Sequence, residues 1–132
     1  MIEKLLVVVG LLIVTGPVWA HHSFSAEFDE KKPVVFEGVV TRMEWVNPHV
    51  WIHIDVKNPD GTVTNWSIEG GTPGMLLRMG LTKESLPAGT ELAIQGFQAK
   101  HGGPMANGSS IKFKDGRKLF LSTAASDKAD KK

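Results

Sequence analysis

Residues 49–57, His-Val-Trp-Ile-His-Ile-Asp-Val-Lys, alternate strictly between two kinds of side chain. Successive side chains of a β-strand point to opposite sides, so this pattern predicts a strand with two unlike faces. One face would carry four aliphatic residues, Val50, Ile52, Ile54 and Val56. The opposite face would carry His49, Trp51, His53 and Asp55. We therefore expect a strand that covers a hydrophobic core and presents imidazole, indole and carboxylate groups on its outer side.

The flanking segments predict two further strands. Residues 34–44 are rich in β-branched side chains on both sides of Gly38, which favours a long strand that bends at the glycine. Asn58-Pro59-Asp60-Gly61 is a strong turn sequence. We expect it to lead into a returning strand at residues 62–69.

A short helix should follow this third strand. Thr72 is a good N-cap residue, and Pro73 suits the first helical position because its missing N–H has no partner there. Asp115-Gly116 is a two-residue hairpin signal. The later strands are expected at residues 91–99, 110–114 and 118–122, with residues 101–108 as a glycine-rich loop.

The order of these elements predicts a mainly β fold. Three strands, a short helix and two or three more strands match the oligonucleotide/oligosaccharide-binding (OB) arrangement, in which a helix follows strand three of a barrel. A bent first strand fits this arrangement, because closure needs a strand that crosses between sheets. We predict a small OB-fold-like antiparallel β-barrel. A six-stranded β-sandwich is the alternative, since periodicity does not separate the two.

The first twenty residues have the three-part layout of a secretory signal peptide. Lys4 precedes an apolar run at residues 5–14, and Val18-Trp19-Ala20 places small or branched residues before a cleavage site. A transmembrane span would need about 20 apolar residues, and Gly16-Pro17 interrupts this stretch. We predict cleavage after Ala20 and a periplasmic or secreted protein with no stable membrane anchor after processing.

The length of 132 residues suits a single folded domain. We expect residues 21–33 to form an N-terminal arm and residues 34–122 to form the barrel. Residues 123–132 are charged and rich in Ala and Ser, which predicts a disordered tail.

Composition excludes several classes of function. The chain has 15 Lys+Arg against 14 Asp+Glu, whereas a nucleic-acid binder normally has a strong basic surplus. The absence of cysteine excludes disulfides, zinc ribbons, iron–sulfur clusters and cysteine nucleophiles. The sequence has neither a Gly-x-Ser-x-Gly elbow nor a His-Glu-x-x-His pair. We therefore predict a protein that is not an enzyme.

Copper binding is the first candidate chemistry. Cleavage after Ala20 would leave His21 with a free α-amine beside its imidazole, and His22 could chelate through the amine, the intervening amide and its ring. Nitrogen-rich ligand sets of this kind suit copper(II). Met105, in the loop that also carries His101, offers a thioether that suits copper(I). The predicted ligands are His21, His22, His101 and Met105.

Ligand binding on the second strand is the other candidate. Trp51 lies between His49 and His53, and an indole beside imidazoles could stack a sugar, a base or a small planar ligand. The two histidines would lie roughly 13 Å apart along a strand, too far to share one metal ion. In the alternative, the arm covers Trp51 with Phe24 or Phe28. The partner would then be a small ligand or an unknown periplasmic protein.

Four segments resemble a family of small exported bacterial proteins that is described only as a domain of unknown function. They are AHHSFSAEFD, GVVTRMEWVNPHVWIHIDV, NWSIEGGTPGMLLRMGLTKESLPAGTELAIQG and KDGRKLFL. The resemblance covers nearly all of residues 21–121. It implies export and a compact β-rich fold, and it implies no activity, substrate or site residue.

Overall fold

The computed structural model describes residues 24–122, which contain six strands and two short helices. The strands are β1 (Phe28–Glu44), β2 (Trp51–Lys57), β3 (Val63–Glu69), β4 (Glu91–Ala99), β5 (Met105–Phe113) and β6 (Lys118–Phe120). The helices are α1 (Phe24–Glu27) and α2 (Pro73–Arg78). The prediction of a mainly β fold with a short helix after strand three is confirmed.

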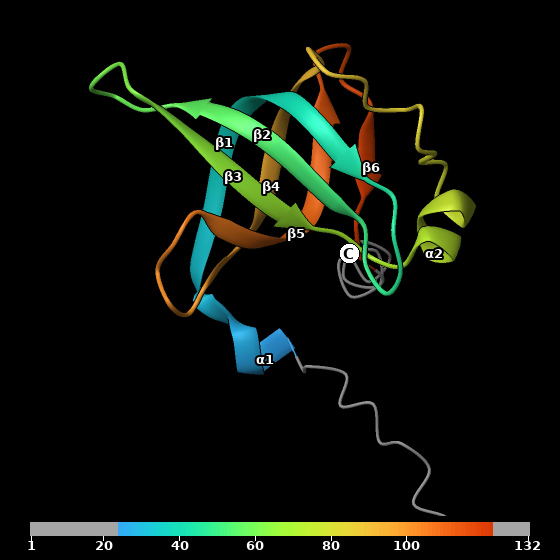
Figure 1. Ribbon diagram of the computed structural model, residues 1–132, viewed down its shortest axis with the longest axis horizontal. Helices are drawn as coiled ribbons and strands as arrows, with labels where there is room; N and C mark the ends of the chain where they lie inside the picture. The colour runs from blue at the N-terminus through green and yellow to red at the C-terminus, as the bar shows by residue number, and fades with distance from the viewer. Residues whose placement is uncertain (1–23, 123–132) are drawn as a thin grey trace, which may run out of the picture.

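The sheet closes on itself. Its strands pair in the order β3-β2-β1-β4-β5-β6, and β3 pairs in addition with β5. That extra ladder is parallel, and it joins Ser67 to Met105 and Glu69 to Asn107. The strands β1, β2, β3, β5 and β4 thus form a ring, with β2 and β3 on the side nearest the viewer in Figure 1. With α2 between β3 and β4, this is the connectivity of an OB-fold barrel.

The long strand β1 makes the closure possible. Its first half pairs with β4, and its second half pairs with β2 from Val39 onward, with an irregularity in that ladder between Val40 and Arg42. A Cβ atom on Gly38 would lie 2.9 Å from the carbonyl oxygen of Asp55. Glycine is therefore needed where β1 passes from one partner to the other. Figure 1 shows β1 curving over the top of the barrel.

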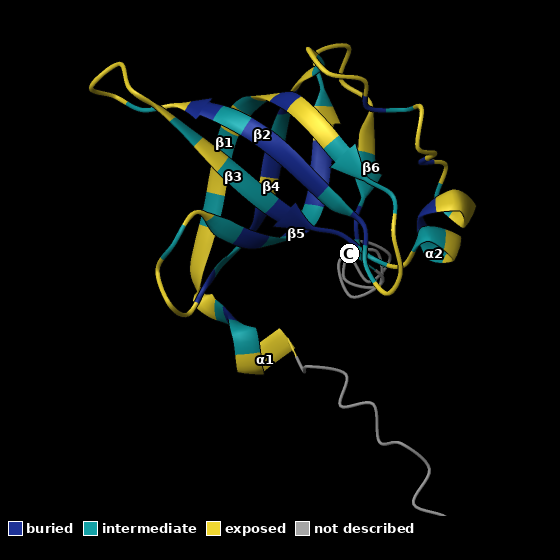
Figure 2. Ribbon diagram, in the orientation of Figure 1, coloured by how far each residue is buried: buried dark blue, intermediate teal, exposed yellow. Residues whose placement is uncertain are grey.

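The barrel interior holds the core. All four residues of the predicted inner row of β2 are buried, none more than 8% exposed: Val50, Ile52, Ile54 and Val56. Leu76 of α2 and two residues of the following loop, Leu81 and Leu86, close one end of the core. Figure 2 shows this burial as dark blue along the middle of β2 and its neighbours, with the β2–β3 hairpin tip exposed.

The N-terminal arm differs from its prediction within the described residues. Phe24 begins a short helix, and β1 begins at Phe28 rather than at residue 34. Phe28 pairs with Ala99 of β4 and is only 2% exposed. The ring of Phe24 stacks on Phe28 and meets Phe97 edge-on. The arm therefore extends the sheet, because its aromatic rings find apolar partners on β4.

Strand β5 also starts earlier than expected. It begins at Met105, whereas the sequence predicted a loop up to Gly108 and a strand from Ser110. The added residues form the parallel ladder with β3. Their partners lie almost forty positions away in the sequence, so local alternation does not reveal them. Met105 is therefore a strand residue, and its predicted place in a flexible loop is wrong.

The predicted signal peptide at residues 1–20, His21, His22 and the predicted tail at residues 123–132 lie outside the described residues. Within residues 24–122, no helix is both long enough and apolar enough to cross a membrane.

Candidate functional site

The outer surface of β1, β2, β3 and β5 carries the predicted ligand-binding residues. Strand register places its side chains in three rows across the strands. The first row is Glu44, Trp51, Glu69 and Asn107; the second is Arg42, His53, Ser67 and Met105; the third is Val39, Asp55 and Asn65. We call these eleven residues the β2–β3 face.

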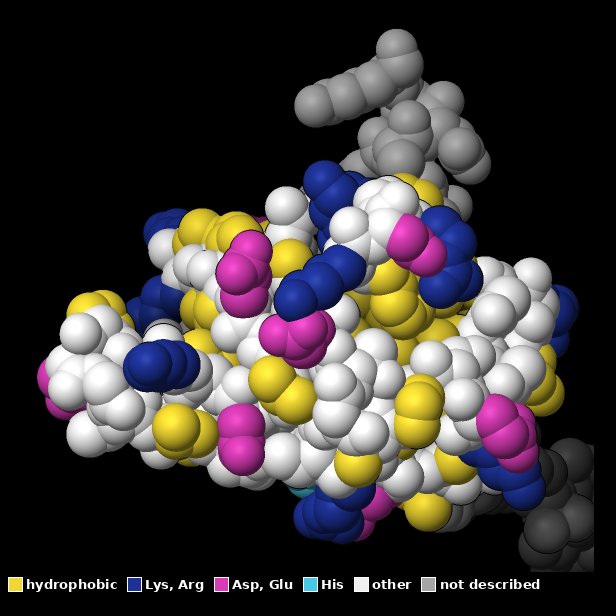
Figure 3. Space-filling model, turned by 90° about the horizontal axis from the view of Figure 1, so that it is seen from above, with side chains coloured by type: hydrophobic (Ala, Val, Ile, Leu, Met, Phe, Trp, Pro, Cys, Tyr) yellow, Lys and Arg dark blue, Asp and Glu magenta, His cyan; other side chains and the backbone are white. Residues whose placement is uncertain are grey.

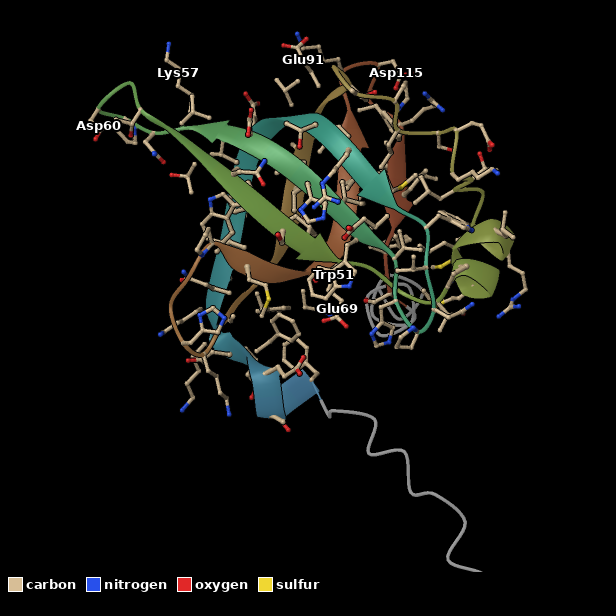
Figure 4. All side chains as sticks on the ribbon, viewed as in Figure 1. Trp51, Lys57, Asp60, Glu69, Glu91 and Asp115 are labelled. Atoms are coloured by element: carbon tan, nitrogen blue, oxygen red, sulfur yellow. The ribbon has the colours of Figure 1, made fainter. Side chains whose placement is uncertain are left out.

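In the first row, Trp51 lies between two carboxylates. It pairs with Glu44 on β1 and with Glu69 on β3. Figure 4 shows Trp51 and Glu69 near one end of β2 and β3, away from the end of β2 that carries Lys57. A half-buried indole between acidic groups is a surface that combines an apolar ring with hydrogen-bond acceptors.

Glu69 is a buried carboxylate, 6% exposed. Burial raises the pKa of Glu69, and the nearby charge of Glu27 raises it further, while the His49 imidazole and the Asn107 amide oppose the shift. The Nδ1 atom of His49 contacts Glu69 Oε1. The loop before β2, the end of β3 and the start of β5 thus meet around one acid group.

In the second row, His53 is 8% exposed and both of its ring nitrogens have partners. Nε2 lies 2.9 Å from Glu44 Oε2, and Nδ1 lies 3.1 Å from Ser67 Oγ. Glu44 also accepts a hydrogen bond of 2.5 Å from Arg42 Nη1. The pKa of Glu44 is held below its ordinary value. The hydrogen bond from His53 has the larger effect, and the hydrogen bond from Arg42 has the next largest.

The third row pairs two polar residues, Asp55 and Asn65, with the exposed Val39. Asn65 Nδ2 donates to Asp55 Oδ1 at 2.8 Å. Thr41, at the irregularity of β1, donates from its hydroxyl to the carbonyl oxygen of His53 at 3.2 Å. The amides and hydroxyls of this face are therefore held in place by their neighbours.

Two loops flank the β2–β3 face (Figure 1). The β1–β2 loop contains a cis Asn47-Pro48 peptide bond and exposes Val46. The β4–β5 loop ends at Pro104, whose carbonyl oxygen accepts the Ser67 backbone N–H at 3.0 Å. Strands two and three with the loops β1–β2 and β4–β5 form the usual binding surface of OB folds.

The structure bears on two of the four predicted copper ligands. His101 Nδ1 accepts the backbone N–H of Gly103 at 2.9 Å, so this lone pair is already used. Met105 lies on β5 opposite Ser67. Among residues 24–122, no group of three or more His, Asp or Glu side chains is placed to hold a metal ion. The copper prediction thus rests on His21 and His22, outside the described residues.

The three predicted ligand-binding residues lie close together. Trp51 and His53 belong to adjacent rows of one face, and His49 contacts Glu69 at the edge of that face. The two histidines have different carboxylate partners, since His49 contacts Glu69 and His53 contacts Glu44.

Sequence reasoning missed the partners of these three residues. They are Glu44, Ser67 and Glu69, and Glu69 has Asn107 as a further partner. The sequence does indicate part of this arrangement, because the alternation of residues 62–69 predicts that Ser67 and Glu69 point away from the core. Which residue stands beside which depends on strand register, and register is a property of the closed sheet.

A hollow with a volume of about 530 Å³ lies over β1, β2, β4 and β5, and it borders the β2–β3 face, because Val39 and Asp55 of that face belong to its lining. Gly38, Val39 and Ala93 line it, and its rim carries lysines and carboxylates, including the ion pair of Lys114 with Glu91. Figure 3 shows both signs of charge interspersed on this end of the molecule. The β2–β3 face combines the half-buried Trp51 indole with carboxylates on both sides, and it is the stronger candidate.

Comparison with known proteins identifies the family to which this chain belongs. A family of unknown function (DUF6152) matches residues 9–108. The chain belongs to this family. No curated protein and no solved structure matches the chain. All eleven residues of the β2–β3 face, from Val39 to Asn107, fall inside the matched part of this DUF6152 member, whereas β6 falls outside it.

Proposed function

We propose that this DUF6152 member is an exported binding module whose β2–β3 face takes a small polar ligand. The observation that carries the proposal is the row in which Trp51 stands between Glu44 and Glu69, on the surface that OB folds commonly use. Export is supported by the signal-peptide pattern that ends at Ala20. A protein partner that binds the same face is the alternative occupant.

The chemistry of the face favours a neutral ligand with several hydroxyl or amide groups. A half-buried indole offers a flat apolar surface, and carboxylate, amide and guanidinium groups beside it offer hydrogen bonds in fixed directions. Arg42 keeps a largely exposed side chain while it pairs with Glu44. The face carries three carboxylates, Glu44, Asp55 and Glu69, and a single guanidinium, which disfavours a polyanion such as nucleic acid. A saccharide has the required combination of an apolar ring face and polar edges.

Trp51 provides the test of this proposal. In a variant with Trp45→Phe and Trp66→Phe, Trp51 is the remaining tryptophan of the mature chain, and acrylamide should quench its emission. Binding to a panel of immobilised neutral oligosaccharides should fall roughly tenfold in Trp51→Ala, which corresponds to about 1.4 kcal/mol. Val35→Ala is the matched control, because Val35 is 70% exposed on the first half of β1, outside the face.

Two results would contradict the small-ligand proposal. One is a Trp51 emission that acrylamide does not quench. The other is oligosaccharide binding that survives Trp51→Ala as well as it survives Val35→Ala. Either result would favour the protein partner as the occupant.

We also propose copper(II) binding at the mature N-terminus, favoured by the His21-His22 sequence directly after the predicted cleavage site. The exported protein should have an intact mass that lacks residues 1–20, and it should bind one Cu(II). Affinity should fall as pH drops through roughly 8 to 6, because the amine and imidazoles must be unprotonated.

The control for copper is the same protein with one Met added before His21. The extra residue moves the α-amine out of the chelate ring, so calorimetry should show sharply weaker binding and electron paramagnetic resonance should report a changed ligand set. Equal Cu(II) affinity of the two proteins would disprove an amine-anchored site. A full-length species held in the membrane would disprove export by cleavage.

A further inference from the structure

A serine, a histidine and a glutamate form a hydrogen-bonded line across three strands. Ser67 on β3 stands directly opposite His53 on β2. Its Oγ atom lies 3.1 Å from His53 Nδ1, and His53 Nε2 lies 2.9 Å from Glu44 Oε2 on β1. Each contact is within hydrogen-bond distance.

The direction of each hydrogen bond follows from the charge of Glu44. Its hydrogen bonds from His53 and Arg42 stabilise the carboxylate, which is acceptor-only. His53 Nε2 must then carry a proton and donate it to Glu44. In a neutral imidazole the other nitrogen, Nδ1, is an acceptor, so the Ser67 hydroxyl donates to it. The Ser67 hydroxyl thus has a base positioned to take its proton, and the base has a carboxylate positioned to stabilise the resulting imidazolium.

We propose that Ser67 is a nucleophile that accepts an acyl group from a small ester, with His53 as its base and Glu44 as a positioning residue. Ser67 Oγ forms a bond to the ester carbonyl carbon, and the bond from that carbon to the alcohol oxygen breaks. The serine proton passes to His53 Nδ1 and then to the departing alcohol. Water cleaves the acyl-serine by the same proton transfers, which restores Ser67.

The surroundings determine which substrate and which rate to expect. Ser67 is half-buried on the outer surface of the barrel, so a small or extended ester fits better than a bulky one. The Ser67 backbone N–H, a natural donor to a developing oxyanion, is already bound to the carbonyl oxygen of Pro104. Turnover should therefore be slow, and labelling of the serine is a more sensitive readout than product release.

The experiment uses the full chain and a fluorophosphonate probe, which bonds to an activated serine oxygen through phosphorus as fluoride leaves. Intact-mass measurement should show one adduct, and peptide mapping should place it on Ser67. Ser67→Ala should lose the adduct. Ser85→Ala should keep it, because the Ser85 hydroxyl bonds to Thr82 and has no imidazole partner in the structure.

The base and the carboxylate have separate tests. His53→Gln should slow labelling at least ~100-fold, within the range of general-base catalysis. Glu44→Gln should slow it at least ~10-fold, because an amide can donate to Nε2 and force the proton onto Nδ1, where Ser67 needs an acceptor. Melting curves identify any variant that fails to fold. The proposal is overturned by an unlabelled wild-type protein, by labelling that persists in Ser67→Ala, or by folded His53→Gln that labels at the wild-type rate.

Discussion

Replacing Ile52 with aspartate should unfold the protein. Ile52 is 0% exposed and lies in the middle of the inner row of β2, where Ile68 is its partner across the β2–β3 ladder. A carboxylate at this position would be buried among aliphatic side chains with no cation beside it. Burial of an unpaired charge costs several kcal/mol, against a typical domain stability of about 5–15 kcal/mol. Circular dichroism and a urea titration should show loss of the cooperative transition or a much lower midpoint.

The control for this substitution is Val35→Asp. Val35 lies on β1 opposite Gln95 and is 70% exposed, so its carboxylate would stay in water and cost little. His53 would be a poor control although it lies on the outer face. It is nearly buried and bonded to Glu44, and an aspartate there would place two carboxylates together. Equal melting of Ile52→Asp and Val35→Asp would contradict the assignment of the two faces.

Replacing Gly96 with alanine should separate β4 from β5. A Cβ atom at Gly96 would lie 2.1 Å from the carbonyl oxygen of Asn107 and 3.2 Å from Cα of Gly108, both backbone atoms of β5. Backbone cannot rotate aside as a side chain can, so the ladder must open at its register shift. Overpacking of this kind costs roughly 1–3 kcal/mol or more. The melting temperature should fall by about 4–8 °C for each kcal/mol lost.

The same substitution at Gly74 is the matched control. Gly74 lies inside α2, and the nearest atom to its added Cβ would be Arg78 Nη1 at 3.8 Å. Alanine favours the helix over glycine by up to about 1 kcal/mol, so Gly74→Ala should be neutral or slightly stabilising. A Gly96→Ala protein as stable as Gly74→Ala would show that β4 and β5 are not packed this closely.

The Ile52 prediction depends on what alternation in the sequence already indicates, whereas the Gly96 prediction depends on the close approach of β4 to β5. Ile52, Ile54 and Val56 lie on one face of β2 and Trp51, His53 and Asp55 lie on the other, as the pattern predicts, although the strand begins at Trp51. The bend at Gly38, the turn at residues 58–61 and the capped helix after Thr72 were also predictable. Each of these features depends on neighbours within a few positions, where local geometry and burial act together.

Only the central residues of the candidate site could be predicted from the sequence. Trp51 and the two histidines follow from the alternation of one strand. Glu44, Ser67 and Glu69 acquire their roles through pairing across three strands, and no short motif joins them. The serine–histidine–glutamate line is therefore invisible to a search for sequence motifs, which looks for a nucleophile and a base at fixed spacing.

The sequence by itself determined the fold class, the two faces of β2 and the resemblance to a family, because these depend on local alternation and on the order of elements along the chain. The tertiary structure alone decided where the sheet closes. The parallel ladder of β3 with β5 lengthened β5 to Met105 and placed Asn107 beside Glu69. It also decided that the arm joins β1, since Phe24 and Phe28 find apolar partners on β4. Contacts between residues far apart in the chain depend on how the whole barrel packs, so a local sequence pattern does not predict them.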